Sequence, residues 1–466
     1  VSLILDSAQT IDSNGDPVSR EARVFNIYEQ AADRPDAFAM GTRLALGGTG
    51  QVLNANDSVY VGDAHISNDW FQALDAAGVT RLSLRTGQPY AGHSGQLQFH
   101  GDVNMHMGQS LHLLVPLLRG DQGRIDLSAP YVRLGSSDFG QLVATAQASS
   151  GNSVLNVQAQ GRDGNGQSDG LLEISGELLT QSMRQVNLSS AGDIRFRGLL
   201  NSAGERFEAG LTTYDQLNLR ADQVYASTLT RADINVLATD GRINVLPGDS
   251  AGASILSAGS HLSFNATRIN QSGVIKAPLG QISFNAGDVI DLNAGSVTSV
   301  SGEGQIVPFG VTRGELEWIY PLRADSLGNS EISLRSTDLL DRDELLTSRA
   351  INLNSDRVNL HDGALVDLNA GALDAQGQIQ ATDNLYAWEF VPGLGGSTDT
   401  LYSENNNGAF AVLPASDSYS PYDFVFWEGT DNIFNPGEQI YLQGSSQLAS
   451  GLYTLLPALF ALLPGS

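Results

Sequence analysis

A short phrase repeated along the chain constrains the fold more than any other feature. Between residues 234 and 372 apolar and polar residues alternate and lead into a glycine-centred turn, as in INVLATDG, LSFNATR, ISFNAGD, IDLNAGS and INLNSDR. In the densest stretches the phrase recurs every seven to nine residues, the length of one short strand plus one tight turn. Such a repeat predicts an elongated β-solenoid in which like side chains stack from coil to coil.

The spacing of the repeats predicts the number of strands in each coil. Leu262 and Phe264 recur 20 residues later as Ile282 and Phe284, which fits three strands per coil. We therefore predict an all-β fold, a single-stranded parallel β-helix. The regular phase of one residue type favours ladders of stacked amides at the corners of the coils over a sugar-binding site. Its members are Asn265, Asn285, Asn293, Asn352, Asn354 and Asn369.

The pattern divides the chain into four parts. Residues 1–80 are expected to hold the N-terminal part of the solenoid, with irregular and helical cover segments. Within them, residues 67–78 predict a short helix that carries Trp70, Phe71 and Leu74 on one face and ends at Gly78. Residues 81–384 form the regular β-helix, interrupted at 302–322. An aromatic-rich insert at 385–440 and a terminal strand segment at 441–466 complete the division.

The charge of the chain excludes two classes of partner. Among 466 residues the net charge is −26, the only lysine is Lys276, and no run of basic residues occurs. Nucleic acid and anionic membrane surfaces are therefore not expected partners. The chain has no cysteine, which excludes disulfides and thiolate metal sites. The apolar C-terminal stretch is interrupted by Pro457 and Pro464 and is too short for a membrane span.

One tripeptide matches a known recognition sequence. Arg119, Gly120 and Asp121 spell the motif that animal integrins bind, and that binding needs a protruding, exposed turn. The tripeptide follows the apolar run LHLLVPLL and precedes QGRIDL, so we expect it at a turn between strands. Gly and Asp are common in turns without any binding role, and a three-residue motif arises readily by chance.

One loop has the alternating oxygen ligands of a calcium site. Asp163, Asn165 and Asp169 lie in GRDGNGQSDG, and IDSNGDP near the N-terminus has a similar pattern. Neither loop has the glycine and glutamate that an EF-hand requires at its sixth and twelfth positions. Ordinary Asx-Gly turns explain both loops better, and calcium is the only cofactor left open.

The aromatic insert is the main candidate for binding. Exposed Trp and Tyr in a Gly/Pro-rich frame suit glycan stacking or protein contact. Packing of the rings onto the rod is the alternative, because so many aromatics seldom stay exposed. The candidate residues are Trp388, Tyr419, Tyr422 and Trp427.

Three stretches of the chain resemble a known family. They are the run from ILSAGSHLSFNATRINQSG to VSGEGQIVPFG at 255–310, LYAWEFVPGLGGS at 385–397 and GLYTLLPALFALLPGS at 451–466. Each is similar to the distal part of filamentous-haemagglutinin-like exoproteins, the secreted partners of bacterial two-partner secretion. The family's N-terminal secretion domain, with its Asn-Pro motifs, is not visible, so we expect an internal or distal piece of a longer molecule.

The resemblance implies a function and a location. It implies a right-handed parallel β-helix that is exported through an outer-membrane transporter and remains at the bacterial cell surface or is secreted. There it would act as a rigid adhesive rod that contacts a glycan or protein on a host or neighbouring cell. Open strand edges at the ends of such a rod also predict capping, continuation into more chain, or end-to-end self-association.

A polysaccharide-acting enzyme is the alternative, since parallel β-helices also carry pectin-type lyases and hydrolases. The polygalacturonase motifs, a Ser-His-Asp elbow and a phosphate loop are all missing, so we expect no catalytic residues. Carboxylates on neighbouring coils cannot be recognised from one sequence. A cleft lined by three or more of them would favour the enzyme, and a smooth rod would favour the structural role.

Overall fold

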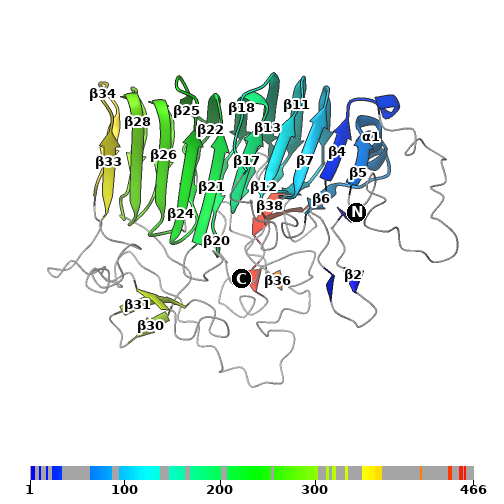
Figure 1. Ribbon diagram of the computed structural model, residues 1–466. Helices are drawn as coiled ribbons and strands as arrows, with labels where there is room; N and C mark the ends of the chain where they lie inside the picture. The colour runs from blue at the N-terminus through cyan, green and yellow to red at the C-terminus, as the bar shows by residue number, and fades with distance from the viewer. Residues whose placement is uncertain are drawn as a thin grey trace.

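The chain winds into a parallel β-helix whose coils follow one another along a single axis (Figure 1). The computed structural model describes residues 2–5, 10–11, 17–18, 24–33, 63–86, 94–136, 146–162, 168–200, 207–252, 255, 257–302, 311–313, 317–321, 331–333, 349–369, 410–411, 439–442, 451–454 and 456–457. Parallel pairing between successive coils confirms the predicted all-β solenoid.

Each complete coil contributes strands to three faces, as the spacing predicted. Face one consists of β5 (Asp63–Ser67), β4 (Val24–Tyr28), β7 (Gln96–His100), β10 (Leu117–Gly120), β17 (Glu177–Gln181), β21 (Phe207–Thr213), β24 (Thr230–Val236), the first halves of β26 (His261–Gln271) and β28 (Gln281–Leu292), and β33 (Ala350–Asn354). Face two consists of β8 (Val103–His106), β11 (Arg124–Ala129), β13 (Ser153–Ala159), β18 (Met183–Ser190), β22 (Gln216–Ala221), β25 (Arg242–Pro247), the second halves of β26 and β28, and β34 (Arg357–Leu360).

Face three forms a separate sheet. It consists of β1 (Ser2–Leu5), β6 (Arg81–Arg85), β9 (Ser110–Leu114), β12 (Tyr131–Gly135), β16 (Leu171–Ser175), β19 (Asp193–Arg197), β23 (Gln223–Ala226), β27 (Val274–Lys276), β29 (Val297–Ser299) and β35 (Leu365–Asp367). Ten strands at about 4.8 Å per rung give this face a length of about 45 Å.

Alternation along each strand builds the core. Apolar side chains at every second position point inward, where Leu97 of β7 lies in register with Leu118 of β10. Phe264 and Phe284 stack one coil apart, with ring centroids 5.3 Å apart, and both are fully buried. Burial of such a side chain contributes roughly 1.5–3 kcal/mol, so the core stabilises the rod along its whole length.

Two ladders of side-chain amides run along the outside of the rod. On face one, Asn265 donates to Asn235 at 2.9 Å, Asn285 to Asn265 at 2.8 Å and Asn354 to Asn285 at 3.0 Å. The predicted ladder is therefore present for three of the six asparagines. These three residues do not lie at the predicted coil corners but within strands, where the pleat stacks them in register. Asn293, which directly follows β28, does lie at a corner.

The second ladder lies on face two and was not predicted. It begins at the Asp126 carboxylate and continues through the next five coils. In each coil an asparagine amide donates to the side chain at the same position one coil earlier. The donors and distances are Asn156 at 2.8 Å, Asn187 at 2.8 Å, Asn218 at 2.6 Å, Asn244 at 2.7 Å and Asn270 at 2.7 Å. Of the other predicted residues, Asn293 bonds Ser272 and Asn352 bonds Ser283, and the Asn369 backbone N–H donates to Asp367.

The N-terminal end of the rod is closed by β5 and helix α1 (Asn68–Ala76). β5 pairs in parallel with β4 on the side away from β7, so it is the outermost strand of face one, and α1 follows it directly, as Figure 1 shows. Phe71 is buried against the core and Gly78 ends the helix with a φ of +77°. This confirms the predicted helical cover. Ser67 makes no side-chain cap, because its hydroxyl donates to Asp69 instead.

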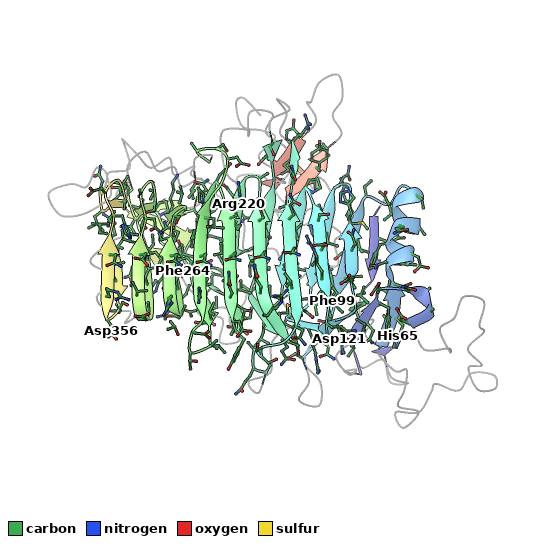
Figure 2. All side chains as sticks on the ribbon, turned by 90° about the horizontal axis from the view of Figure 1, so that it is seen from above. His65, Phe99, Asp121, Arg220, Phe264 and Asp356 are labelled. Carbon is green, nitrogen blue, oxygen red and sulfur yellow. The ribbon has the colours of Figure 1, made fainter. Side chains whose placement is uncertain are left out.

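The opposite end of the described helix is open. Within the described residues, β33, β34 and β35 each pair on one side only. Val358 and Leu360 are 41% and 62% exposed, whereas Ile290 and Leu292, which they face in register, are 0% and 1% exposed. Figure 2, a view from above, places His65 and Asp121 toward the capped end and Asp356 at this open end.

Smaller antiparallel pieces lie off the helix axis. β30 (Val311–Arg313), β31 (Glu317–Pro321) and β32 (Glu331–Ser333) form one small sheet within the chain that connects β29 to β33. The remaining short pairs are β2 (Thr10–Ile11) with β3 (Pro17–Val18), β14 (Gly161–Arg162) with β15 (Ser168–Asp169), β20 (Leu199–Leu200) with β21, and β36 (Phe410–Ala411) with β39 (Leu456–Pro457). One further element is the 3-10 turn η1 (Ala31–Asp33).

The hairpin of β37 (Gln439–Leu442) and β38 (Gly451–Thr454) packs beside β12 on face three, far from its neighbours in sequence (Figure 1). The Arg81 guanidinium donates to the Tyr441 carbonyl at 3.4 Å, and Tyr453 is 4% exposed. In the described part of the chain, no helix is long and apolar enough to cross a membrane.

Candidate functional site

A hollow of about 320 Å³ lies on the outer surface of face one, over β17, β21 and β24. Carboxylates from all three strands line it. Its lining consists of Glu177, Leu178, Glu208, Ala209, Gly210, Thr212, Arg231, Asp233 and Asn235. The cleft that would favour an enzyme over a smooth rod, with three carboxylates on consecutive coils, is therefore present in outline.

The register of the strands explains how the hollow forms. Glu177 of β17 faces Gly210 of β21, which faces Asp233 of β24, so these three residues form one row across the coils. Arg231 and Asn235 lie two positions before and after Asp233 on the same outward face of β24. They face Glu208 and Thr212 of β21 in register. Because the central position of this outward grid is a glycine, no side chain fills the space between the two carboxylates of the row.

Gly210 is not required by its backbone conformation, because its φ does not lie in the left-handed region. A Cβ atom built on it would come no closer than 3.1 Å to any neighbouring atom, the nearest being the Asp233 carbonyl oxygen. A larger residue is therefore accepted after a small shift and would project into the hollow. This makes the hollow a feature that one substitution can fill.

The surroundings of the hollow shift the pKa of one of its carboxyl groups. Burial raises the pKa of Glu177, and the neighbouring negative charge of Glu208 raises it further. Beyond the hollow, burial lowers the pKa of His261 and the charge of Arg231 lowers it again, against the opposite effect of Asp233. A raised pKa makes a carboxyl group easier to protonate, and in its protonated form it can donate a hydrogen bond or a proton to a ligand.

The predicted calcium loop lies mostly outside the described residues. Asp163 and Asn165 are not described, and Asp169 lies in the short strand β15, where its carboxylate accepts a hydrogen bond from the Gly170 backbone at 2.7 Å. Among the residues that the structure describes, no group of three or more His, Asp or Glu side chains is arranged to hold a metal ion. Calcium binding stays a prediction.

The integrin-type tripeptide spans the end of a strand. Arg119 and Gly120 belong to β10 and pair with Gln98 and Phe99 of β7, while Asp121 begins the following turn. Arg119 and Asp121 are exposed, but Gly120 is buried. The Asp121 carboxylate accepts a bond from the Gly101 backbone at 3.2 Å and lies 2.9 Å from His100 Nδ1. Recognition of this tripeptide stays a prediction.

The aromatic candidates Trp388, Tyr419, Tyr422 and Trp427 all lie outside the described residues. Their role in binding therefore stays a prediction that rests on the sequence.

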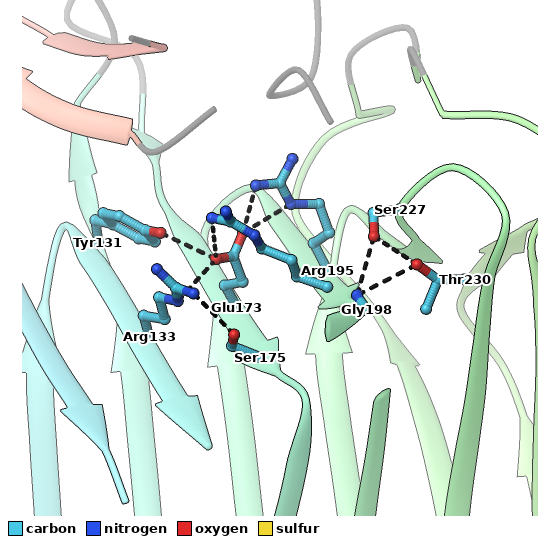
Figure 3. Close-up of polar contacts among 9 residues, drawn as sticks. Tyr131, Arg133, Glu173, Ser175, Arg195, Gly198, Ser227 and Thr230 are labelled. Atoms are coloured by element: carbon cyan, nitrogen blue, oxygen red, sulfur yellow. Dashed lines mark hydrogen bonds and ion pairs between the residues drawn. The ribbon is translucent and has the colours of Figure 1, made fainter. Parts of the chain in front are cut away.

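A buried ion network lies on the outer side of face three (Figure 3). The sequence patterns did not predict it. Glu173 is its centre. The guanidinium of Arg195 donates to Glu173 Oε2 at 2.8 Å, Arg133 lies 3.3 Å from Oε1 and the Tyr131 hydroxyl donates to Oε1 at 3.1 Å. Arg133, Glu173 and Arg195 occupy one register position in β12, β16 and β19 and are at most 2% exposed.

The network shifts the pKa of two buried groups. Burial alone would raise the pKa of Glu173, but Arg195, Arg197 and Arg133 lower it to about 2. One strand earlier, burial and the charge of Arg133 lower the pKa of His112 to about 3. Glu173 therefore stays ionised and His112 neutral at physiological pH. Because its groups are closed off from solvent, the network resembles a structural ion cluster more than a catalytic site.

Comparisons with known proteins do not assign the chain to a family. No family model matches the chain, and neither a curated protein nor a solved structure matches it.

Proposed function

We propose that this chain is a rigid structural and adhesive segment of a large secreted bacterial surface protein, in line with its resemblance to filamentous-haemagglutinin-like exoproteins. The observation that supports this best is the continuity of the stack. An apolar core and two amide ladders run from coil to coil along the rod. Such repetition resists bending and separates distant ends, which suits a spacer that carries a contact surface away from the cell.

The location and partners form part of the same proposal. Export through an outer-membrane transporter and residence at the cell surface are carried over from the resemblance. The partner on a host or neighbouring cell is a surface glycan or protein. The net charge of −26 supports an exposed rod that stays dispersed instead of sticking to its copies side by side.

A cell-binding experiment tests the adhesive role. Beads coated with the chain are compared with beads coated with an equally acidic, non-adhesive protein, and bacterial and animal cells retained on each are counted. We expect retention above the control. Loss after glycosidase treatment of the cells identifies a glycan receptor, and loss after protease treatment identifies a protein. Equal retention on both kinds of bead across the cells tested would overturn the adhesive role.

A polysaccharide-acting enzyme is the second candidate, and the hollow over β21 favours it. Glu177 and Asp233 flank Gly210 there, and the raised pKa of Glu177 suits a proton donor. Incubation with polyuronic, neutral and amino polysaccharides, followed by an assay for new reducing ends, tests this function. Turnover that disappears in Glu177→Gln would establish the enzyme, and no release from any polymer would reject it.

A further inference from the structure

We propose that the hollow centred on Gly210 binds a saccharide unit that carries a free ammonium group, such as an amino sugar within a glycan. This inference rests on the proposed contact function, for which it supplies a binding site and a ligand class. It rests on the shape of the hollow, on the polar groups around it and on the balance of their charges.

The size of the hollow suits one or two sugar rings. Its volume of about 320 Å³ lies at the lower end of the roughly 300–1,000 Å³ that small-molecule sites span. The missing side chain at Gly210 places the deepest part between Glu177 and Asp233, the two carboxylates that face it across the coils.

The charges select the ligand. The lining contains three acidic residues, Glu177, Glu208 and Asp233, and one basic residue, Arg231, which faces Glu208 in register. A uronic-acid or sulfated sugar would be repelled, whereas an ammonium group is attracted to the carboxylates at close approach. Among the described residues, no three carboxylate or histidine groups are arranged around one point to hold a metal ion.

The remaining lining groups suit hydroxyls. Thr212 and Asn235 lie side by side in register on one flank, where the Asn235 amide donates to the Thr212 hydroxyl at 3.3 Å and accepts from Asn265 at 2.9 Å. The O–H of Thr212 and the second N–H of the Asn235 amide can donate to sugar oxygens. On the other flank Arg231 can donate to ring and hydroxyl oxygens. An ammonium group over Gly210 with sugar hydroxyls on both flanks would therefore meet partners of matching polarity.

Calorimetric titration of the full chain with three trisaccharides tests the proposal. The probes are the trimers of glucosamine, N-acetylglucosamine and galacturonic acid. We expect the glucosamine trimer to bind at least tenfold more tightly than its acetylated form, and the galacturonate trimer not to bind. Salt should weaken the binding, because the attraction is between charges near the surface. Equal affinity for the first two trimers, or no binding of the glucosamine trimer, would overturn the proposal.

Three variants locate the site. Gly210→Val fills the hollow and Glu177→Gln removes one charge with little change of shape, so each should weaken binding of the glucosamine trimer at least tenfold. Asp240→Asn removes an exposed carboxylate outside the hollow and should leave binding unchanged. Thermal unfolding checks that every variant is folded, and Glu177→Gln keeps the test valid if Gly210→Val is not. Unchanged binding in folded Gly210→Val and Glu177→Gln would overturn the assignment.

The bead experiment separates this inference from the proposed function. If Gly210→Val beads still retain cells while trimer binding is absent in the wild type, the adhesive role stands and the ligand site is wrong. If the trimer binds but wild-type beads retain no cells, the site stands and the adhesive role is wrong.

Discussion

Asn285 donates its side-chain amide to Asn265, one coil earlier, at a distance of 2.8 Å. The two residues occupy the same position in successive strands, so a bond that is formed once is formed again wherever the register continues. The ladder thereby links neighbouring coils through side chains in addition to their backbone hydrogen bonds.

Breaking the face-two ladder at Asn218 should destabilise the rod. This amide donates to Asn187 at 2.6 Å and accepts from Asn244 at 2.7 Å and from Gln216 at 3.1 Å, so Asn218→Ala removes three hydrogen bonds. We expect a loss of about 1–3 kcal/mol, measured by denaturant unfolding. Arg220→Ala is the control, because this outward residue of the same strand is 52% exposed, and its ion pair should contribute less than about 1 kcal/mol. A cost for Asn218→Ala no greater than the control would contradict the prediction.

Removing the charge at the centre of the ion network should be far more costly. Glu173→Ala would leave Arg133 and Arg195 buried without the carboxylate that they share. Loss of one partner of a buried ion pair typically costs about 3–5 kcal/mol. Denaturant unfolding should show such a loss, whereas Asp249→Asn at an exposed pair should change stability by less than about 1 kcal/mol. Similar effects of the two substitutions would show that the network contributes little.

The same carboxylate should contribute to acid unfolding. The pKa of Glu173 is about 2 in the folded chain, below the 4.5 of an ordinary glutamate, so the unfolded chain takes up the proton first. The stabilisation is fully present above pH 4.5 and is lost as the pH falls toward 2. Unfolding free energies measured across this range should fall less steeply in Glu173→Gln than in the wild type. Parallel profiles would contradict the shift.

His112 should act over a higher range of pH. Its pKa is about 3 in the folded chain against an ordinary 6.5, so below pH 6.5 protonation favours the unfolded chain. Stability should fall as the pH drops from 6.5 toward 3, by at most about 1.4 kcal/mol per pH unit from this one group. His112→Gln should remove that part of the slope. His106→Gln, a substitution on an exposed residue of β8, serves as the control and should retain it.

The periodic features of the structure could be predicted from the sequence. Phe264 and Phe284, with their neighbours, repeat at a spacing that matches one coil, and Trp70 and Phe71 precede Leu74 by four and three residues, the spacing of one helix face, before a terminating glycine. Both patterns arise from local geometry, the pleat in one case and the helical turn in the other. The core and the helical cover follow directly from them.

The candidate sites could not be predicted in the same way, because the coils differ in length. Asn265 and Asn285 are 20 residues apart, whereas Asn235 and Asn265, also one coil apart, are separated by 30. Without the exact register, nothing in the sequence brings Glu177 and Asp233 to opposite sides of Gly210. Outward polar residues are expected on every strand, so Glu173 carried no signal that it would be buried.

The two ends of the described helix give the molecule a direction. β5 and α1 seal one end, whereas the strands of the coil that holds Leu360 still have a free edge. New windings can be added at that free edge without disturbing the seal. Duplication of a single coil there would lengthen the reach of the protein by one rung while its cap and its hollow kept their places, so evolution can adjust length independently of contact chemistry.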